Sequence, residues 1–173
     1  MESGEVVYNR HMEITQEKKT SPKDVFIHLL AIVTLYICAV SFLVMVFQYV
    51  NILFPDALTE SGYYARTGMN AAIRWSIATL VIIFPVYLFT MKFLNKSYEM
   101  MPTKRDLRIR KWLIYFTLFV AALVIMGDLV TLINNLLNGE LTIRFSLKVL
   151  AVLFVAGSIF FYYFTDLKKH NTE

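Results

Sequence analysis

Four long apolar segments constrain this chain more than any other feature of its sequence. The first covers residues 26–50 and contains no Asp, Glu, Lys or Arg, and the others cover residues 75–91, 112–137 and 149–165. An α-helix rises about 1.5 Å per residue, so about 20 apolar residues cross a hydrocarbon core about 30 Å thick. With the flanking turns included, each segment is long enough, and the sequence predicts four membrane spans.

The spans are expected to be helical, because the bilayer core offers no water to the polar groups of the backbone. A soluble four-helix bundle is the competing interpretation, but each of its helices would need a charged face, and these segments have none. We therefore predict an all-α integral membrane protein, a bundle of four transmembrane helices. The spans are expected at about residues 25–53, 72–93, 110–137 and 143–166.

The polar segments around the spans predict a single domain with two tails. Residues 1–20 carry mixed charges and little apolar surface, which predicts a mobile N-terminal tail. Residues 21–167 form the four-span domain, and residues 168–173 a short C-terminal tail. The first span begins too late and is too long for a cleaved signal peptide, so we expect it to remain in the mature protein.

Lys and Arg residues are distributed unevenly between the two sides of the predicted membrane. Of these 17 residues, 13 lie in the two tails and the middle loop, and 4 lie in or beside the other two loops. Basic residues concentrate on the cytoplasmic side of membrane proteins. This predicts a multi-pass protein of the cell (inner) membrane with both termini in the cytoplasm. The same rule explains the net charge of +4 without nucleic acid as a partner.

Several residues mark helix ends and a bend. Ser21 precedes a proline and is expected to cap the first helix, and the pattern after Pro102 predicts that the third helix begins at Thr103. Its residues 104–111 are then expected to rest at the lipid headgroups as a basic turn. Residues 138–139, Asn-Gly, are typical of a helix end, and Pro85 should kink the second span.

Asp128 is the only charged residue between positions 112 and 137. A carboxylate at membrane depth is costly and needs a partner. Lys148 falls at a similar depth on the next helix of the predicted hairpin, so we expect the two to form an ion pair. Such a pair fixes the register of the hairpin, and we favour this structural role over an acid whose protonation or ion binding drives movement.

The predicted intramembrane polar cluster extends around this pair. On the fourth helix, Glu140, Arg144 and Lys148 follow one another at a spacing of four residues, which places them on one face. The complete candidate set is Asp128, Lys148, Arg144, Glu140, Asn135 and Arg74.

The sequence offers no chemistry of catalysis. The single cysteine, Cys38, excludes an internal disulfide and a paired-thiol oxidoreductase. His28 has no second ligand at helical spacing, so it is interpreted as an interfacial side chain and not as a metal ligand. Motifs of metalloproteases, serine hydrolases and phosphate-binding loops are missing. We therefore predict that the protein is not an enzyme and has no catalytic residue, cofactor or metal.

Small and polar residues recur at helical spacing along each span, for example Thr34, Cys38 and Ser41 in the first. Helices in lipid associate through such residues, so the stripes are expected to face inward in the bundle. The predicted function is that of a non-enzymatic membrane subunit that self-associates or binds another membrane protein in the bilayer. The alternative is an oligomeric channel or transporter with a polar site around Asp128 and Lys148.

Several segments also resemble a known family of small bacterial four-span membrane proteins, catalogued as a domain of unknown function. They are residues 21–26, 28–31, 108–115, 117–125, 127–133, 139–142, 144–145 and 147–150. The resemblance extends over residues 21–167 and is most specific in the third span. It implies a four-span architecture and a bacterial origin, and it implies no activity.

Overall fold

The computed structural model describes residues 21–55, 63–100, 107–139 and 141–170, with backbone alone for residues 63–65 and 169–170. These ranges contain four α-helices and no strand: α2 (Pro22–Leu53), α3 (Tyr63–Met100), α4 (Arg108–Leu137) and α5 (Ile143–His170). Each helix is long and apolar enough to cross a membrane. The all-α, four-helix prediction is confirmed, whereas the tail predicted at residues 1–20 lies outside the described residues.

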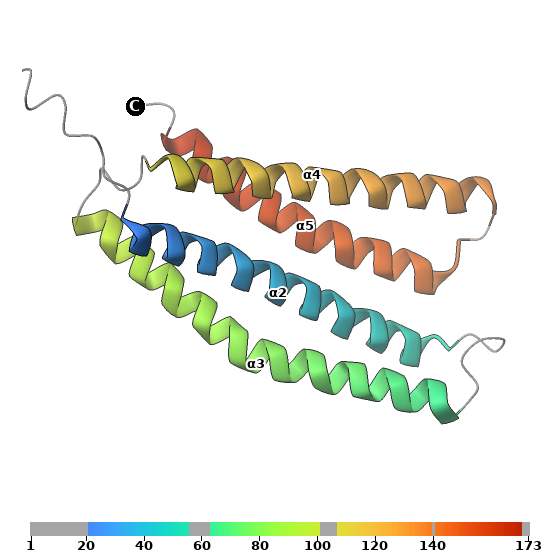
Figure 1. Cartoon of the computed structure of the whole chain (residues 1–173). Coiled ribbons are helices and arrows are strands. Elements are labelled where there is room, and N and C mark those ends of the chain that lie inside the picture. Colours follow the sequence, from blue (N-terminus) through green and yellow to red (C-terminus); the bar gives the residue numbers. More distant parts are fainter. Residues whose placement is uncertain (1–20, 56–62, 101–106, 140, 171–173) are drawn as a thin grey trace, which may run out of the picture.

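The four helices form two antiparallel hairpins, α2 with α3 and α4 with α5 (Figure 1). The starts of α2 and α4 and the ends of α3 and α5 lie together at one end of the molecule, which we call the proximal end. The ends of α2 and α4 and the starts of α3 and α5 lie at the opposite, distal end. Helix α2 packs against all three others, whereas the backbone of α3 packs against α2 alone among the described helices.

The start of α2 follows the sequence closely. Ser21 is the N-cap in an extended conformation, and Pro22 occupies the first helical turn, where its missing N–H costs nothing. The Ser21 side chain makes no capping bond, and its carbonyl oxygen instead accepts from the backbone N–H of Asp24 at 2.9 Å. The start of α2 is therefore set by Ser21 and Pro22 without a side-chain cap.

The start of α4 differs from the prediction. The helix begins at Arg108 and not at Thr103, which itself lies outside the described residues. Leu107 has φ −58° and ψ 128°, so the backbone is extended at that position. Its side chain is only 5% exposed. Burial of this apolar side chain stabilises the extended backbone at Leu107, directly before the helix.

The distal turn between α4 and α5 confirms the Asn-Gly prediction. Asn138 is the C-cap, and Gly139 has φ +70°, a conformation that glycine adopts without the steric penalty of a Cβ. The Gly139 N–H donates to the carbonyl oxygen of Leu136 at 3.2 Å. This bond satisfies one of the last carbonyls of α4 and lets α5 begin four residues later, at Ile143.

Pro85 lies inside α3, and the helix continues through it. Figure 1 shows α3 changing direction about midway along its length, where Pro85 lies. A proline removes one helix hydrogen bond and displaces the preceding turn, so it accounts for the bend. The bend lets the long α3 follow α2.

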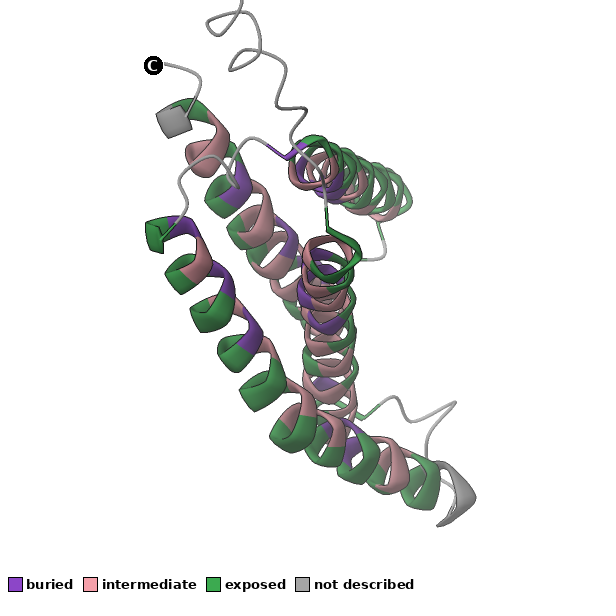
Figure 2. Ribbon diagram, turned by 60° about the vertical axis from the view of Figure 1, so that its left-hand side comes forward, coloured by how far each residue is buried: buried purple, intermediate pink, exposed green. Residues whose placement is uncertain are grey.

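Burial is uneven along the bundle, and α4 shows this most clearly (Figure 2). Its buried residues are Leu113, Ile114, Thr117 and Ala121, all in the proximal half. One turn further along the same face, Val124 is 42% exposed. The proximal half of α4 is therefore packed into the bundle, whereas its distal half is open on the side that should face inward.

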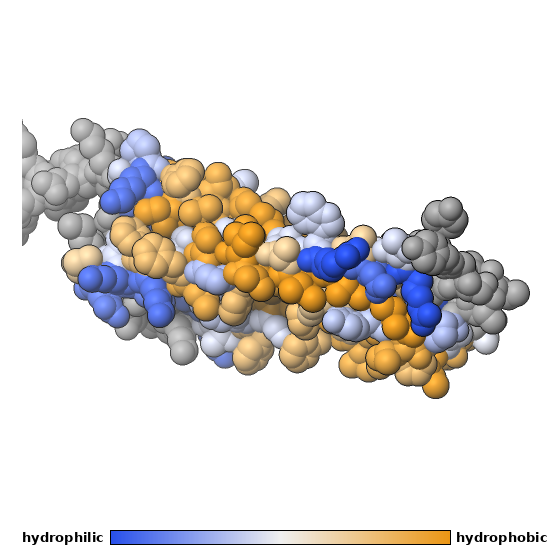
Figure 3. Space-filling model, turned by 90° about the horizontal axis from the view of Figure 1, so that it is seen from below, coloured by the Kyte–Doolittle hydropathy of each residue, from blue (hydrophilic) through white to orange (hydrophobic). Residues whose placement is uncertain are grey.

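The molecular surface seen from the α3 side is apolar across its middle (Figure 3). Hydrophilic residues gather toward the two ends of this face. This distribution fits helices that cross a hydrocarbon layer with their ends near the headgroups.

Candidate functional site

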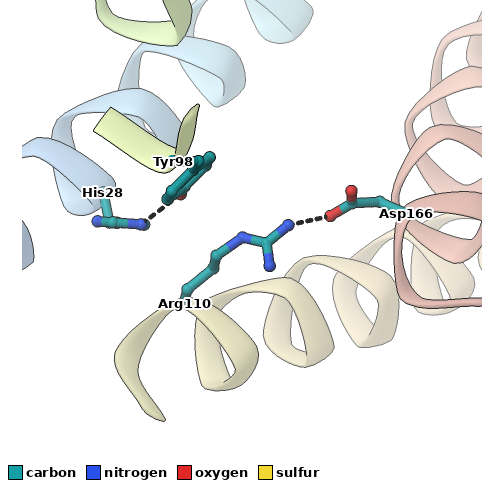
Figure 4. Close-up of polar contacts among 4 residues, drawn as sticks. All are labelled: His28, Tyr98, Arg110 and Asp166. Carbon is teal, nitrogen blue, oxygen red and sulfur yellow. Dashed lines mark hydrogen bonds and ion pairs between the residues drawn. The ribbon is translucent and has the colours of Figure 1, made fainter. Parts of the chain in front are cut away.

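The proximal end holds a set of four polar side chains, one from each helix (Figure 4). We call it the proximal cluster, and it consists of His28 (α2), Tyr98 (α3), Arg110 (α4) and Asp166 (α5). Figure 4 shows the guanidinium of Arg110 lying between Tyr98 and Asp166. The cluster connects the two hairpins at the end where α2 begins and α5 ends.

His28 links α2 to α3 through both ring nitrogens. Its Nδ1 lies 2.6 Å from the backbone carbonyl oxygen of Asp24, and its Nε2 lies 2.6 Å from the Tyr98 hydroxyl. A carbonyl oxygen only accepts, so Nδ1 carries the proton. In the neutral ring Nε2 then accepts from the Tyr98 hydroxyl. His28 is only 6% exposed, so this buried imidazole is satisfied on both sides.

Arg110 links the second hairpin to the first. Its Nη2 lies 2.6 Å from Oδ2 of Asp166, the ion pair that joins α4 to α5. The guanidinium carbon also lies 5.2 Å from the centroid of the Tyr98 ring, within the range of a cation–π interaction. The side chains of Arg110 and Asp166 are 13% and 29% exposed, so water screens the pair only in part. A partly screened pair with good geometry holds its partners more firmly than an exposed one.

A cavity of about 100 Å³ lies beside these side chains. Besides the proximal cluster, it is lined by apolar residues of α2, α3 and α4 and by Asn95, Tyr162 and Tyr163. Such a volume holds a few water molecules. Within the described ranges no three His, Cys, Asp or Glu side chains come together to hold a metal ion. The polar side chains of the proximal cluster contact one another across helices. This arrangement therefore holds the four helices together.

Sequence reasoning did not find the proximal cluster. It interpreted His28 as an interfacial side chain and Arg110 as part of a basic turn at the headgroups, and it assigned no role to Asp166. Because basic residues are common at the cytoplasmic ends of membrane spans, the position of Arg110 could be explained without an acidic partner. One signal was available, because Asp166 is the only acidic residue of α5, and a lone acid near a predicted membrane boundary calls for a cation.

Asp128 is partly buried on α4, in the distal half of the helix. Its Oδ2 is shielded from solvent and has no hydrogen-bond partner within the described ranges. The expected ion pair with Lys148 is not formed between these two described residues. Lys148 instead places its ammonium 5.7 Å from the centroid of the Phe47 ring on α2. The expectation was wrong because α5 turns this face toward α2 and not toward α4.

Arg144 also faces α2. Its Nε donates to Oδ1 of Asn51 at 3.0 Å, and the amide nitrogen of Asn51 donates to Gln48 at 3.2 Å. This polar network ties the distal part of α5 to the end of α2. Its partners on α2 were not predicted, since the register between these two helices cannot be read from the sequence.

The remaining candidates lie apart. Asn135 donates to the carbonyl oxygen of Thr131 on its own helix at 2.9 Å. Arg74 is exposed on α3, whose backbone makes no contact with α4 or α5 among the described helices. Glu140 lies outside the described residues. The five candidates that the structure describes therefore do not form one site: Arg144 and Lys148 face α2, Asp128 and Asn135 lie on α4, and Arg74 lies on the far edge.

Comparison with known proteins gives a family and no activity. Neither the curated proteins nor the solved structures contain a match to this chain. A protein family described as a domain of unknown function, DUF5671, matches residues 24–163, which include all of the proximal cluster except Asp166. Because this match covers most of the chain, the protein belongs to the DUF5671 family.

Proposed function

We propose that this protein is a non-enzymatic membrane subunit that associates with itself or with another membrane protein. The observation that carries the proposal is the open distal half of α4. The buried face of α4 ends at Ala121. None of the residues that continue this face toward Leu137 is buried. A single chain therefore leaves part of its own helix–helix packing surface uncovered.

The uncovered face is not purely apolar. It contains Thr131, which is exposed, and Asp128 and Asn135, which are partly exposed. Polar groups that face hydrocarbon cost free energy, and a helix that packs against them removes this cost. An additional transmembrane helix on this face would supply the packing that one chain lacks and a partner for Asp128, whose Oδ2 has none among the described residues.

Chemical cross-linking in native membranes tests the association. We expect cross-linked species larger than the 20.1 kDa chain, either multiples of its mass or complexes with a second membrane protein. The control is the same reaction after dispersal in excess detergent, which separates weakly associated subunits. Recovery of monomers alone from native membranes, at reagent levels that cross-link a known membrane dimer, would contradict the proposal.

We also propose that the proximal end lies in the cytoplasm, so that both termini are cytoplasmic, and that the membrane is a bacterial inner membrane. The distribution of Lys and Arg supports this orientation. In a Cys38→Ser background, an impermeant thiol reagent added outside intact cells should label Asn138→Cys and leave Arg108→Cys unlabelled. The reverse labelling pattern would place the termini outside.

An oligomeric channel or transporter is the second candidate, favoured by one observation. The Asp128 carboxylate lies in a helix apolar enough to span a membrane, and one of its oxygens has no hydrogen-bond partner within the described ranges. Such an acid is a candidate for ion or proton binding. If the protein conducts ions in liposomes, Asp128→Asn should abolish most of the flux, whereas Lys148→Met should alter it less. Flux unchanged by both substitutions would remove the support for this function.

A further inference from the structure

Two opposite charges lie unpaired in the distal half of the molecule. Asp128 on α4 and Arg74 on α3 form no hydrogen bond or ion pair with any other residue in the parts of the chain that the structure describes. Arg74 is exposed, and Asp128 is partly exposed. An unpaired charge near hydrocarbon is costly for both residues, and each has the partner chemistry that the other needs.

The two charges cannot meet within one chain. Helices α3 and α4 lie at opposite edges of the molecule in two views, and they make no backbone contact within the described ranges (Figures 1 and 2). Helix α2 and helix α5 lie between them. A partner for Asp128 must therefore come from outside the chain, and the same is true for Arg74.

The charges lie at similar distances from the distal end. Asp128 is nine residues before Leu137, the end of α4, which corresponds to about 14 Å. Arg74 is eleven residues after Tyr63, the start of α3, which corresponds to about 17 Å. Both helix ends lie at the distal end of the molecule. In copies that share one orientation in a membrane, the two side chains are therefore at nearly the same depth.

The neighbouring residues continue this match. Helix α3 runs away from the distal end and α4 runs toward it, so α3 of one copy lies antiparallel to α4 of another. In that register Asn70 lies level with Thr131, and Ala78 lies level with Val124, to within about 3 Å. All four residues are exposed. On the distal side of the charges a polar residue of α3 therefore faces a polar residue of α4, and on the proximal side an apolar residue faces an apolar residue.

We propose that the occupant of the open face of α4 is α3 of a second copy of this chain, with Arg74 of one copy paired to Asp128 of the next. This inference rests on the proposed function, because it names the partner in the association. A guanidinium forms strong, charge-assisted hydrogen bonds with a carboxylate, which suits a site with few other donors. Because the contact joins two different edges, it is a head-to-tail contact, and its repetition gives a closed ring or an open row of copies in the membrane.

Disulfide cross-linking between differently tagged full-length copies tests the contact with both charges in place. In a Cys38→Ser background, one copy carries Ala78→Cys and the other carries Val124→Cys. We expect mild oxidation in membranes to join the two tags. The matched control replaces Val124→Cys with Met126→Cys, which is 54% exposed, lies within about 3 Å of the depth of Val124 and points to the opposite side of the helix. The control pair should remain unjoined.

Exchange of the two charges between the copies gives a second test of the contact. In the same cross-linking pair, Arg74→Glu in the first copy should reduce the disulfide yield at least several-fold, and Asp128→Arg in the second copy should restore it. If copies associate in native membranes but the Ala78–Val124 yield does not exceed that of the control, this contact is wrong and the proposed function stands. If the chain is monomeric and binds no partner in native membranes, both fail.

Discussion

Arg110→Ala should lower the free energy of unfolding by about 2 kcal/mol, as expected for loss of a charged hydrogen bond in a partly buried site. The substitution removes the guanidinium that lies 2.6 Å from the Asp166 carboxylate and 5.2 Å from the Tyr98 ring centroid. It therefore weakens the link between the two hairpins and leaves Asp166 without this cation. The measurement is unfolding of the purified full-length protein in mixed micelles with increasing denaturing detergent.

A double-mutant cycle separates the ion pair from a general effect of lost packing. Asp166→Ala alone should also destabilise, and the double variant should lose less than the sum of the two single variants by about 1 kcal/mol. The control is Arg108→Ala, which removes a basic side chain that is exposed in the same turn. It should change stability by less than about 0.5 kcal/mol. Additive effects of the two single substitutions would show that the pair contributes nothing to stability.

The fold was predictable from the sequence because lipid leaves few choices. Four apolar segments long enough to span a bilayer must be helices, and the Ser-Pro start of α2 and the Asn-Gly end of α4 are local signals that need no tertiary information. The start of α4 was predicted incorrectly for a tertiary reason. Leu107 is buried by contacts that the residues around Pro102 do not encode.

The candidate site was predicted less well, because depth in a membrane does not determine which helix faces which. Asp128 and Lys148 were correctly placed on neighbouring helices of one hairpin, yet rotation of α5 directs Lys148 to the Phe47 ring of α2. The Arg110–Asp166 pair was missed for the converse reason. Its residues are 56 positions apart, and only the packing of α4 against α5 brings them together.

The uneven burial of α4 makes a sharp prediction, because two threonines on this helix have the same local bonding in different surroundings. Thr117 is completely buried, and its hydroxyl donates to the carbonyl oxygen of Leu113 at 2.9 Å. Thr131 is exposed, and its hydroxyl donates to the carbonyl oxygen of Gly127 at 2.8 Å. Thr117→Leu should destabilise by about 1–3 kcal/mol, because the larger side chain overpacks the helix contact.

Thr131→Leu is the matched control, since it makes the same chemical change and removes the same kind of bond. In micelles that hold single copies it should change the unfolding free energy by less than about 0.5 kcal/mol. In membranes the expectation differs, because Thr131 lies on the face proposed to meet α3 of a second copy. There Thr131→Leu should lower the yield of the Ala78–Val124 cross-link while the monomer remains stable. Equal destabilisation of the monomer by both substitutions would show that the distal half of α4 is packed as tightly as the proximal half, and the open face on which the proposed association depends would not exist.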